Sequence, residues 1–186
     1  MRIIAGEAKS LPLKTLPGSE TRPTTDRIKE TLFNMIHPYL TGCRFLDLFA
    51  GSGSIGLEAL SRGAKEAVFV ERNKKAAAVI RENMEFTKLA SGGRLYCMDV
   101  FAALRELEHQ EQEPFDIVFM DPPYHQLLEK QVMEALLTSH LIAEHTLLIA
   151  EASRETDFSY LEDLGYELEK IKLYKTNVHT FIRKRA

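Results

Sequence analysis

A turn of four residues, Asp121-Pro122-Pro123-Tyr124, follows the apolar stretch FDIVFM and combines a carboxylate, two prolines and an aromatic ring. Because proline has no backbone N–H to donate to a sheet, the prolines end a strand here and stiffen the turn. The carboxylate and a backbone carbonyl of the turn can accept the two N–H groups of an amine conjugated to a ring, and they stabilise positive charge that develops on its nitrogen. Tyr124 can stack on a flat base, which contributes about 1–3 kcal/mol. The turn therefore predicts methyl transfer to a ring-bound amine, and a surface Asp-Pro turn is the alternative.

The segment DLFAGSGSIGLEAL carries glycines at positions 51, 53 and 56 in the spacing G-x-G-x-x-G. Glycines allow a tight turn and a close approach of the backbone to a ligand, and the spacing keeps a dinucleotide-binding fold open as an interpretation. Asp47, before the first glycine, is not part of that fingerprint. In enzymes that use S-adenosylmethionine, an acid at this place meets the cationic methionine end of the cofactor.

Two further acids end predicted strands, Glu71 after EAVFV and Asp99 after LYCM. Glu71 can accept hydrogen bonds from both hydroxyls of a ribose, and Asp99 can accept one from an adenine amino group while the backbone of Val100 meets the ring. Taken singly, each acid is equally compatible with a solvated strand end. Because the carboxyl ends of parallel strands meet at one sheet edge, where ligands bind, the succession Asp47, Glu71, Asp99 predicts one cofactor site.

The segments that carry these residues alternate between strand and helix patterns. This alternation predicts an α/β Rossmann-like fold, with a mainly parallel seven-stranded sheet, helices on both faces and an antiparallel C-terminal hairpin. Residues 2–16 predict a small N-terminal β-hairpin. The expected strands are 43–50, 66–71, 94–100, 115–121, 146–152 and the hairpin 167–184. The expected helices are 27–40, with Thr25 or Asp26 as its cap, 54–64, 73–89, 101–110, 125–142 and 158–166.

The length of 186 residues predicts one domain, 1–186, with an N-terminal extension over 1–40 and a core over 41–186. No apolar run approaches the roughly 20 residues of a transmembrane helix, and no signal peptide is evident. Cys43 and Cys97 lie in apolar surroundings, which predicts buried free thiols and a cytoplasmic location, with a disulfide or metal pair as the alternative. We expect a monomer without a membrane anchor or a metal ion.

The net charge of -3 argues against a protein that coats nucleic acid indiscriminately. Basic residues nevertheless gather at both ends of the chain, and from residue 170 onward there are six of them and no acid. They are either solvated chain ends or a surface for a polyanion.

In their order and spacing, DLFAGSGSIGLEAL, FVE, MDV and DPPY resemble the amino-methyltransferases of the Rossmann type that depend on S-adenosylmethionine (SAM). The N-terminal MRIIAGEAKSLPL followed by RPTTDRIKETLFNMI is more particular, and resembles the bacterial RsmD-type family over essentially the whole chain. This resemblance implies methylation of the exocyclic N2 of guanine 966 in 16S ribosomal RNA. The implied partner is a 30S ribosomal subunit or an assembly intermediate.

The resemblance also implies roles for individual residues. The methionine part of SAM would be held by Asp47, Phe49, Ala50, Gly51, Ser52 and Gly53, the ribose by Glu71, and the adenine by Asp99 and Val100. Thr24, Thr25 and Phe33 would close over the cofactor, and Asp121, Pro122, Pro123 and Tyr124 would form the catalytic turn. Glu151 resembles an acid that family members carry after the fifth strand, and its role stays open.

Under this resemblance the basic chain ends become candidates for phosphate contacts, which position an RNA. The candidates are Arg2, Arg22, Arg27, Lys175, Lys184 and Arg185. The target base has to leave its stack, and without a second domain the shape of the RNA or of the assembled particle has to guide recognition. Family members often carry a Tyr-Gly pair in the last hairpin turn, whereas this chain has Tyr174-Lys175-Thr176-Asn177. Asn177 tolerates a left-handed conformation and is expected to serve that turn.

Three other functions fit parts of the pattern. A DNA or other RNA methyltransferase acting on adenine N6 or cytosine N4 would also use the turn, but such enzymes usually carry a separate target-recognition region, for which this chain has no room. A dehydrogenase gives no role to Asp47 or to the double-proline turn. A non-catalytic RNA-binding assembly factor has no reason to keep both the turn and the glycine loop.

Overall fold

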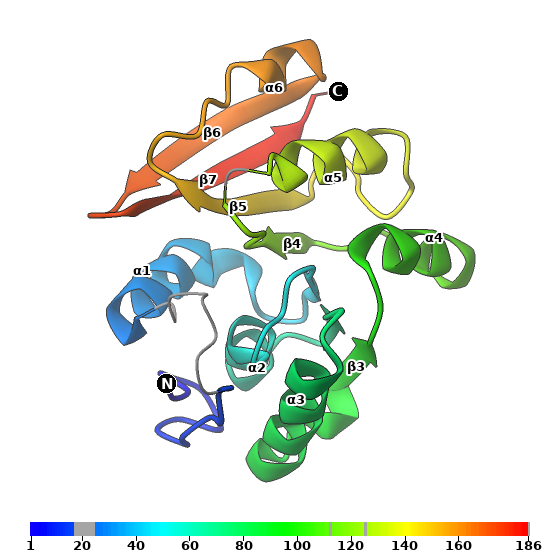
Figure 1. Cartoon of the computed structure of the whole chain (residues 1–186). Helices are drawn as coiled ribbons and strands as arrows, with labels where there is room; N and C mark the ends of the chain where they lie inside the picture. Colours follow the sequence, from blue (N-terminus) through cyan, green and yellow to red (C-terminus); the bar gives the residue numbers. More distant parts are fainter. Residues whose placement is uncertain (17–24, 112, 125, 186) are drawn as a thin grey trace.

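The computed structural model describes residues 1–16, 25–111, 113–124 and 126–185. Within these ranges, strands form one seven-stranded sheet in the order β3-β2-β1-β4-β5-β7-β6. Figure 1 shows this order, from the C-terminal hairpin at the top to β3 at the bottom. The strands are β1 Arg44–Asp47, β2 Glu66–Val70, β3 Gly93–Tyr96, β4 Ile117–Met120, β5 Leu147–Ser153, β6 Tyr166–Leu173 and β7 Asn177–Lys184. The first five pair in parallel and β7 pairs antiparallel with β5 and β6, so the fold prediction is confirmed.

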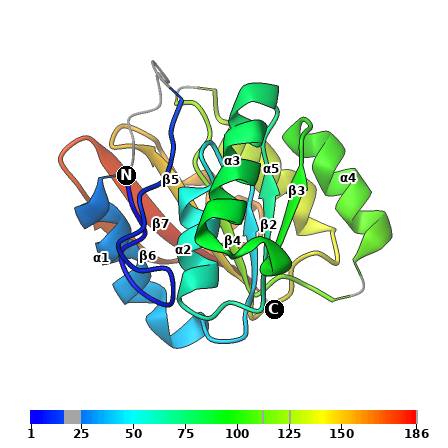
Figure 2. The ribbon, with the colours of Figure 1, turned by 90° about the horizontal axis from the view of Figure 1, so that it is seen from below.

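Helices cover both faces of the sheet, which is why β1 and β4 are buried at every position. The core on one face includes side chains of α1, α2 and α3, and the core on the other face includes side chains of α4, α5 and α6. Figures 1 and 2 show α1 and α4 on opposite sides of the molecule. The helices are α1 Asp26–Ile36, α2 Ser54–Ser61, α3 Lys74–Thr87, α4 Val100–Gln110, α5 Leu128–Leu137 and α6 Tyr160–Asp163, with 3-10 turns η1 His37–Tyr39 and η2 Ala90–Gly92. No helix in the described ranges has the length and apolar composition needed to cross a membrane.

The N-terminal segment folds back on itself but forms less sheet than expected. Its antiparallel pairing is reduced to one bridge between Arg2 and Pro12. The backbone N–H groups of Ile4, Ala5 and Ala8 instead donate to side chains of α2, so they are not available to a longer ladder. The segment consequently lies against α2 (Figure 2).

Two boundaries differ from the sequence-based expectation in ways that affect the site. β3 ends at Tyr96, and Asp99 is the N-cap of α4. Asn177 was expected to occupy a left-handed turn position, which is wrong: it is the first residue of β7 and is absent from the residues with positive φ. The turn is closed by the backbone N–H of Tyr174, which donates to the Asn177 carbonyl at 2.9 Å, and the Asn177 side chain points to β5.

Candidate functional site

The candidate site lies at the carboxyl edge of the sheet, between β1 and β4. Along the chain, β2 and β3 extend the sheet to one side of β1, and β4 and β5 extend it to the other. This reversal makes a switch point, where open α/β sheets bind ligands. Asp47 ends β1 and Asp121 directly follows β4, and the Leu48 N–H donates to the Phe119 carbonyl at 3.0 Å. The topology therefore brings the predicted cofactor acid and the predicted catalytic acid to adjacent strand ends.

Asp47 is a buried carboxylate, with 1% of its surface exposed. Its Oδ2 accepts a hydrogen bond from the backbone N–H of Gly56 in the first turn of α2, at 3.1 Å. Burial raises the pKa of Asp47 to about 7; the Gly56 hydrogen bond opposes this rise and the charge of Glu71 adds to it. A cationic group beside Asp47 would therefore be strongly favoured, because it would compensate the buried negative charge.

The glycine loop after β1 uses its glycines for different reasons. Gly53 is the N-cap of α2 and has a φ of 79°. This left-handed backbone conformation is one that residues other than glycine rarely adopt. At Gly56 a Cβ would lie 2.3 Å from the ring of Phe69 in β2, so only glycine lets α2 pack this closely. A Cβ at Gly51 would meet nothing within 4 Å, which leaves open space beside the loop.

Glu71, which follows β2, is joined to this loop. Its Oε2 accepts from the backbone N–H of Gly51 at 2.9 Å, and its Oε1 accepts from the N–H of Asn73 at 2.8 Å. Carboxylate oxygens have further lone pairs, so ribose hydroxyls could still donate to Glu71. The half-buried Phe49 packs against the core on the α4 side, and the Ala50 N–H donates to the Val70 carbonyl at 3.0 Å.

Asp99 and Val100 lie at the start of α4. Oδ1 of Asp99 accepts from the N–H groups of Phe101 and Ala102, at 2.9 and 3.3 Å. Val100 is buried, and as the first helical residue its N–H has no partner within the helix. The exposed Asp99 and this N–H are thus placed to meet the edge of a flat ring.

The turn after β4 holds the predicted catalytic residues. Asp121 is half-buried, Pro122 is buried, and Pro123 and Tyr124 are exposed, Tyr124 by 40%. Burial raises the pKa of Asp121 well above its usual range, and the negative charges of Glu151 and Asp47 raise it further. The turn thus presents a carboxyl group with a raised pKa and an exposed aromatic ring at the same edge as the glycine loop.

Two of the residues expected to close over the cofactor are described by the structure, whereas Thr24 and the RNA candidate Arg22 lie outside the described residues. Thr25 caps α1, its Oγ1 accepting from the Ile28 N–H at 3.3 Å. The assignment of Phe33 to cofactor closure is not supported, because Phe33 is 0% exposed. Its ring stacks on Phe45 at 6.5 Å between centroids and lies under the Arg62 guanidinium. Phe33 is a core residue because α1 turns this face toward the sheet.

The candidate RNA contacts separate into two groups. Lys175 is exposed in the β6–β7 turn, at the carboxyl edge of the sheet, and Arg27 is exposed on α1. Lys184 and Arg185 lie at the opposite end of β7, away from the site. Lys184 donates to the Leu137 carbonyl at 2.8 Å, and Arg185 pairs with Glu162 at 3.4 Å. The structure does not bring these two residues to the predicted site, because β7 runs antiparallel to β5. Arg2 pairs with Asp26 at 2.8 Å.

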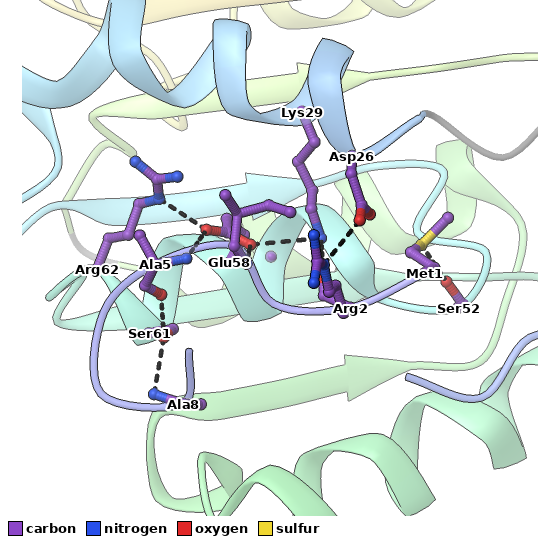
Figure 3. Close-up of polar contacts among 12 residues, drawn as sticks. Met1, Arg2, Ala5, Ala8, Asp26, Lys29, Ser52, Glu58, Ser61 and Arg62 are labelled. Carbon is purple, nitrogen blue, oxygen red and sulfur yellow. Dashed lines mark hydrogen bonds and ion pairs between the residues drawn. The ribbon is translucent and has the colours of Figure 1, made fainter. Parts of the chain in front are cut away.

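A buried ion cluster that sequence reasoning missed holds the N-terminal segment on α2 (Figure 3). Glu58, which is 0% exposed, accepts from the N–H groups of Ile4 and Ala5 at 2.8 and 3.0 Å. It also pairs with Lys29 at 3.3 Å and with Arg62 at 2.7 Å. Burial lowers the pKa of Lys29, and the charge of Glu58 opposes that change. The only sequence signal was an acid within an otherwise apolar helix.

Asn83 of α3 joins the same N-terminal segment to the glycine loop. Its Oδ1 accepts from the Lys14 N–H at 2.9 Å, and its Nδ2 donates to the carbonyls of Lys14 and Ser52 at 3.1 and 2.9 Å. The side chain of Ser52 in turn contacts the Met1 sulfur at 3.7 Å (Figure 3). The N-terminal segment therefore supports the backbone of the predicted cofactor loop.

A separate hollow of about 690 Å³ lies at the amino ends of β1, β4 and β5. Its lining includes Tyr39, Cys43, Asp116, His145 and Arg183, and it contains none of the predicted site residues. We place the site at the other edge because acids and glycines from four separate segments converge there, where this fold binds its ligands.

Comparison with known proteins shows the family to which this chain belongs. The family model described as Conserved hypothetical protein 95 matches residues 1–182. Ribosomal RNA small subunit methyltransferase D of Haemophilus influenzae is 38% identical over 156 residues, which cover 83% of this chain and 80% of that protein. The protein of the same name from Escherichia coli K12 is 36% identical over 157 residues, which cover 83% of this chain and 76% of that protein. The solved structure of a hypothetical protein from Thermus thermophilus superimposes with a TM-score of 0.83 at 32% identity, covering 100% of this chain and 99% of that one. The chain therefore belongs to the Conserved hypothetical protein 95 family, the RsmD-type family that its motifs resemble.

Proposed function

We propose that this protein methylates ribosomal RNA with SAM as the methyl donor, and that its target is the exocyclic N2 of a guanine in the small-subunit RNA. The observation that supports this most strongly is the placement of Asp121 and Asp47 at adjacent strand ends, beside the glycine loop. The relatives named as small-subunit RNA methyltransferases support the substrate class. The choice of guanine 966 and of a 30S particle rests on resemblance to that family.

The residues at the glycine loop fit SAM. When bound, SAM supplies a methyl group on a positively charged sulfur. Asp47 would hold the cationic methionine end, since a buried carboxylate with a raised pKa gains most from a cation. Glu71 would accept from the ribose hydroxyls, and Asp99 with the Val100 N–H would meet the adenine edge. The open space beside Gly51 leaves room for the methionine part.

At the turn after β4, the chain's own groups act on the amine. Asp121 and the Pro122 carbonyl would each accept one N–H of the target nitrogen, which orients its lone pair and stabilises the positive charge that grows there. Tyr124 would stack on the base. Lys175 and Arg27 would contact phosphates and set the position of the RNA.

Transfer of a tritiated methyl group from SAM tests the proposal, with small-subunit particles, naked 16S RNA and duplex DNA assayed in parallel. We expect label in RNA, recovered as N2-methylguanine after digestion to nucleosides. Label in DNA, or on adenine N6 or cytosine N4, would support the second candidate, an amino-methyltransferase of another class. An absence of label on every substrate, with RNA still bound, would support a non-catalytic assembly factor.

A further inference from the structure

A buried polar network joins the catalytic side of the sheet to the C-terminal hairpin. Glu151 in β5 is 5% exposed, and both of its carboxylate oxygens have partners from β7. Its Oε1 accepts from Nδ2 of Asn177 at 2.7 Å, and its Oε2 lies 2.9 Å from Nε2 of His179. His179 is fully buried, and its Nδ1 lies 3.4 Å from the Tyr174 hydroxyl. None of these groups has a role in the proposed methyl transfer.

The strand register places this network next to the catalytic acid. Phe119 of β4 is paired with Ile149 of β5, so extending the register by two residues sets Asp121 beside Glu151. Because side chains alternate along a strand, Glu151 lies on the same face of the sheet as Ile149, and its charge acts on Asp121. Glu151 is paired in turn with His179 across the antiparallel ladder. Asp121, Glu151 and His179 therefore form a row across three adjacent strands.

Tyr174 and His179 form a chain of hydrogen bonds that ends at Glu151. Burial raises the pKa of Tyr174 to about 12, and the charge of Glu151 adds to this, so the phenol keeps its proton and donates it to Nδ1 of His179. With this donor at Nδ1, the imidazole tautomer that carries its proton on Nε2 donates to Glu151. With Asn177 donating to the other oxygen, both oxygens of the buried Glu151 carboxylate are hydrogen-bonded.

We propose that Glu151 is a positioning residue whose charge, held by Asn177 and His179, makes Asp121 a stronger acceptor for the proton that the substrate nitrogen releases. This inference rests on the proposed function. As the nitrogen lone pair forms the new N–C bond, the bond between the methyl carbon and the donor sulfur breaks and its electron pair stays on sulfur, so the positive charge passes to the nitrogen. Its N–H bond breaks, the electron pair of that bond returns to nitrogen as a lone pair, and the proton forms an O–H bond on the Asp121 carboxylate. Asp121 then releases the proton to solvent.

The groups whose charge acts on Asp121 come from its neighbouring strands. They are Glu151 from β5 and Asp47 from β1, and His179 and Tyr174 act through Glu151. Both acids raise the pKa of Asp121 after the larger effect of burial. Removing the charge of Glu151 should therefore lower that pKa, while Asp47 and burial keep it above the usual range.

The variant Glu151→Gln removes the charge and keeps the shape, and Glu155→Gln, at an exposed position, is the matched control. A carbon-13 titration of the Asp121 carboxyl, assigned with Asp121→Asn, should show its pKa lowered by about one to two units in Glu151→Gln and unchanged in Glu155→Gln. The acid limb of the kcat–pH profile should shift to lower pH by the same amount. The maximal kcat should fall about threefold to tenfold, with the KM for SAM within about twofold.

Two substitutions of His179 separate charge control from simple packing. His179→Gln keeps an N–H that can reach Glu151, whereas His179→Phe keeps a ring without a donor. We expect His179→Phe to lower the pKa of Asp121 as Glu151→Gln does. In His179→Gln the pKa of Asp121 should stay close to its wild-type value. An unmoved Asp121 titration in Glu151→Gln, or equal behaviour of the two His179 variants, would overturn this inference while leaving methyl transfer by the wild type intact. Absence of methyl transfer by the wild type would overturn the proposed function and the inference with it.

Discussion

Oε2 of Glu71 accepts a hydrogen bond from the backbone N–H of Gly51 at 2.9 Å. The acid that follows β2 thus fixes the first glycine of the loop that follows β1. One carboxylate therefore has two tasks, because it shapes the glycine loop and lies where a ribose would be held. Loss of Glu71 should disturb cofactor binding even if the ribose contact itself were weak.

We expect Glu71→Gln to weaken SAM binding by about tenfold or more, since a hydrogen bond to a charged group contributes about 1.5–3 kcal/mol. Glu85→Gln, on the exposed side of α3, provides a control with the same change of charge. Isothermal titration calorimetry measures both affinities. Equal affinities in the two variants would mean that Glu71 does not support the cofactor site.

The pKa of Asp47, raised to about 7 by burial, predicts pH-dependent binding of a cationic cofactor. A nearby cation favours the ionised carboxylate, so affinity should be highest above pH 7 and should fall as the pH drops through 7. Between pH 8 and pH 6 we expect the Kd for SAM to rise about tenfold. Asp47→Asn should bind weakly and remove this part of the pH dependence. A wild-type profile that matches that of Asp47→Asn would exclude a charge interaction at Asp47.

The buried pair of Lys29 and Glu58 should be needed for stability. Lys29→Met leaves Glu58 buried without one of its cationic partners, and breaking a buried pair in this way costs about 3–5 kcal/mol. We expect a loss of about 3 kcal/mol in the free energy of unfolding, because Arg62 and two backbone N–H groups remain. The exposed Lys9→Met should change it by less than about 0.5 kcal/mol. Urea unfolding compares the two, and equal stabilities would show that Lys29 is dispensable.

The two ends of the C-terminal hairpin should differ in RNA binding. Lys172 and Lys175 lie toward the carboxyl edge of the sheet, where the site is, whereas Lys184 and Arg185 lie toward the other edge. Replacing Lys172 and Lys175 with Ala should weaken RNA binding. It should also make the slope of log affinity against log salt concentration shallower, by the amount that corresponds to the loss of about two phosphate contacts. Replacing Lys184 and Arg185 with Ala should leave both nearly unchanged. Filter binding over a series of salt concentrations tests this, and the opposite ranking would place the RNA on the far edge.

Much of the fold could be predicted from the sequence because its signals are local. The buried strands are short apolar runs. Glu71 and Asp121 each stand where such a run ends, and Asp47 lies just before the glycine loop. Parallel topology then brings those ends to one edge. The burial of Phe33 could not be predicted because the sequence does not show which face of α1 meets the sheet.

The remaining contacts depend on distant parts of the chain. Asn83 bonds to residue 14 and to residue 52, and Glu151 bonds to β7, which pairs with β5 only in the folded sheet. No spacing in the sequence predicts such pairs. The positions of Lys184 and Arg185 could not be predicted for the same reason. Their charge is evident in the sequence, but the edge of the sheet at which they lie is set by the antiparallel direction of β7.

The central claim, that Asp121 acts on the target amine, is tested most directly by Asp121→Asn, with Asp163→Asn on the exposed side of α6 as its control. Methyl transfer from SAM to small-subunit particles and the Kd for SAM are measured on the same preparations. We predict that Asp121→Asn lowers kcat by at least about a hundredfold and leaves the Kd for SAM within about twofold, while Asp163→Asn matches the wild type. Turnover of Asp121→Asn at the wild-type rate would contradict the assignment.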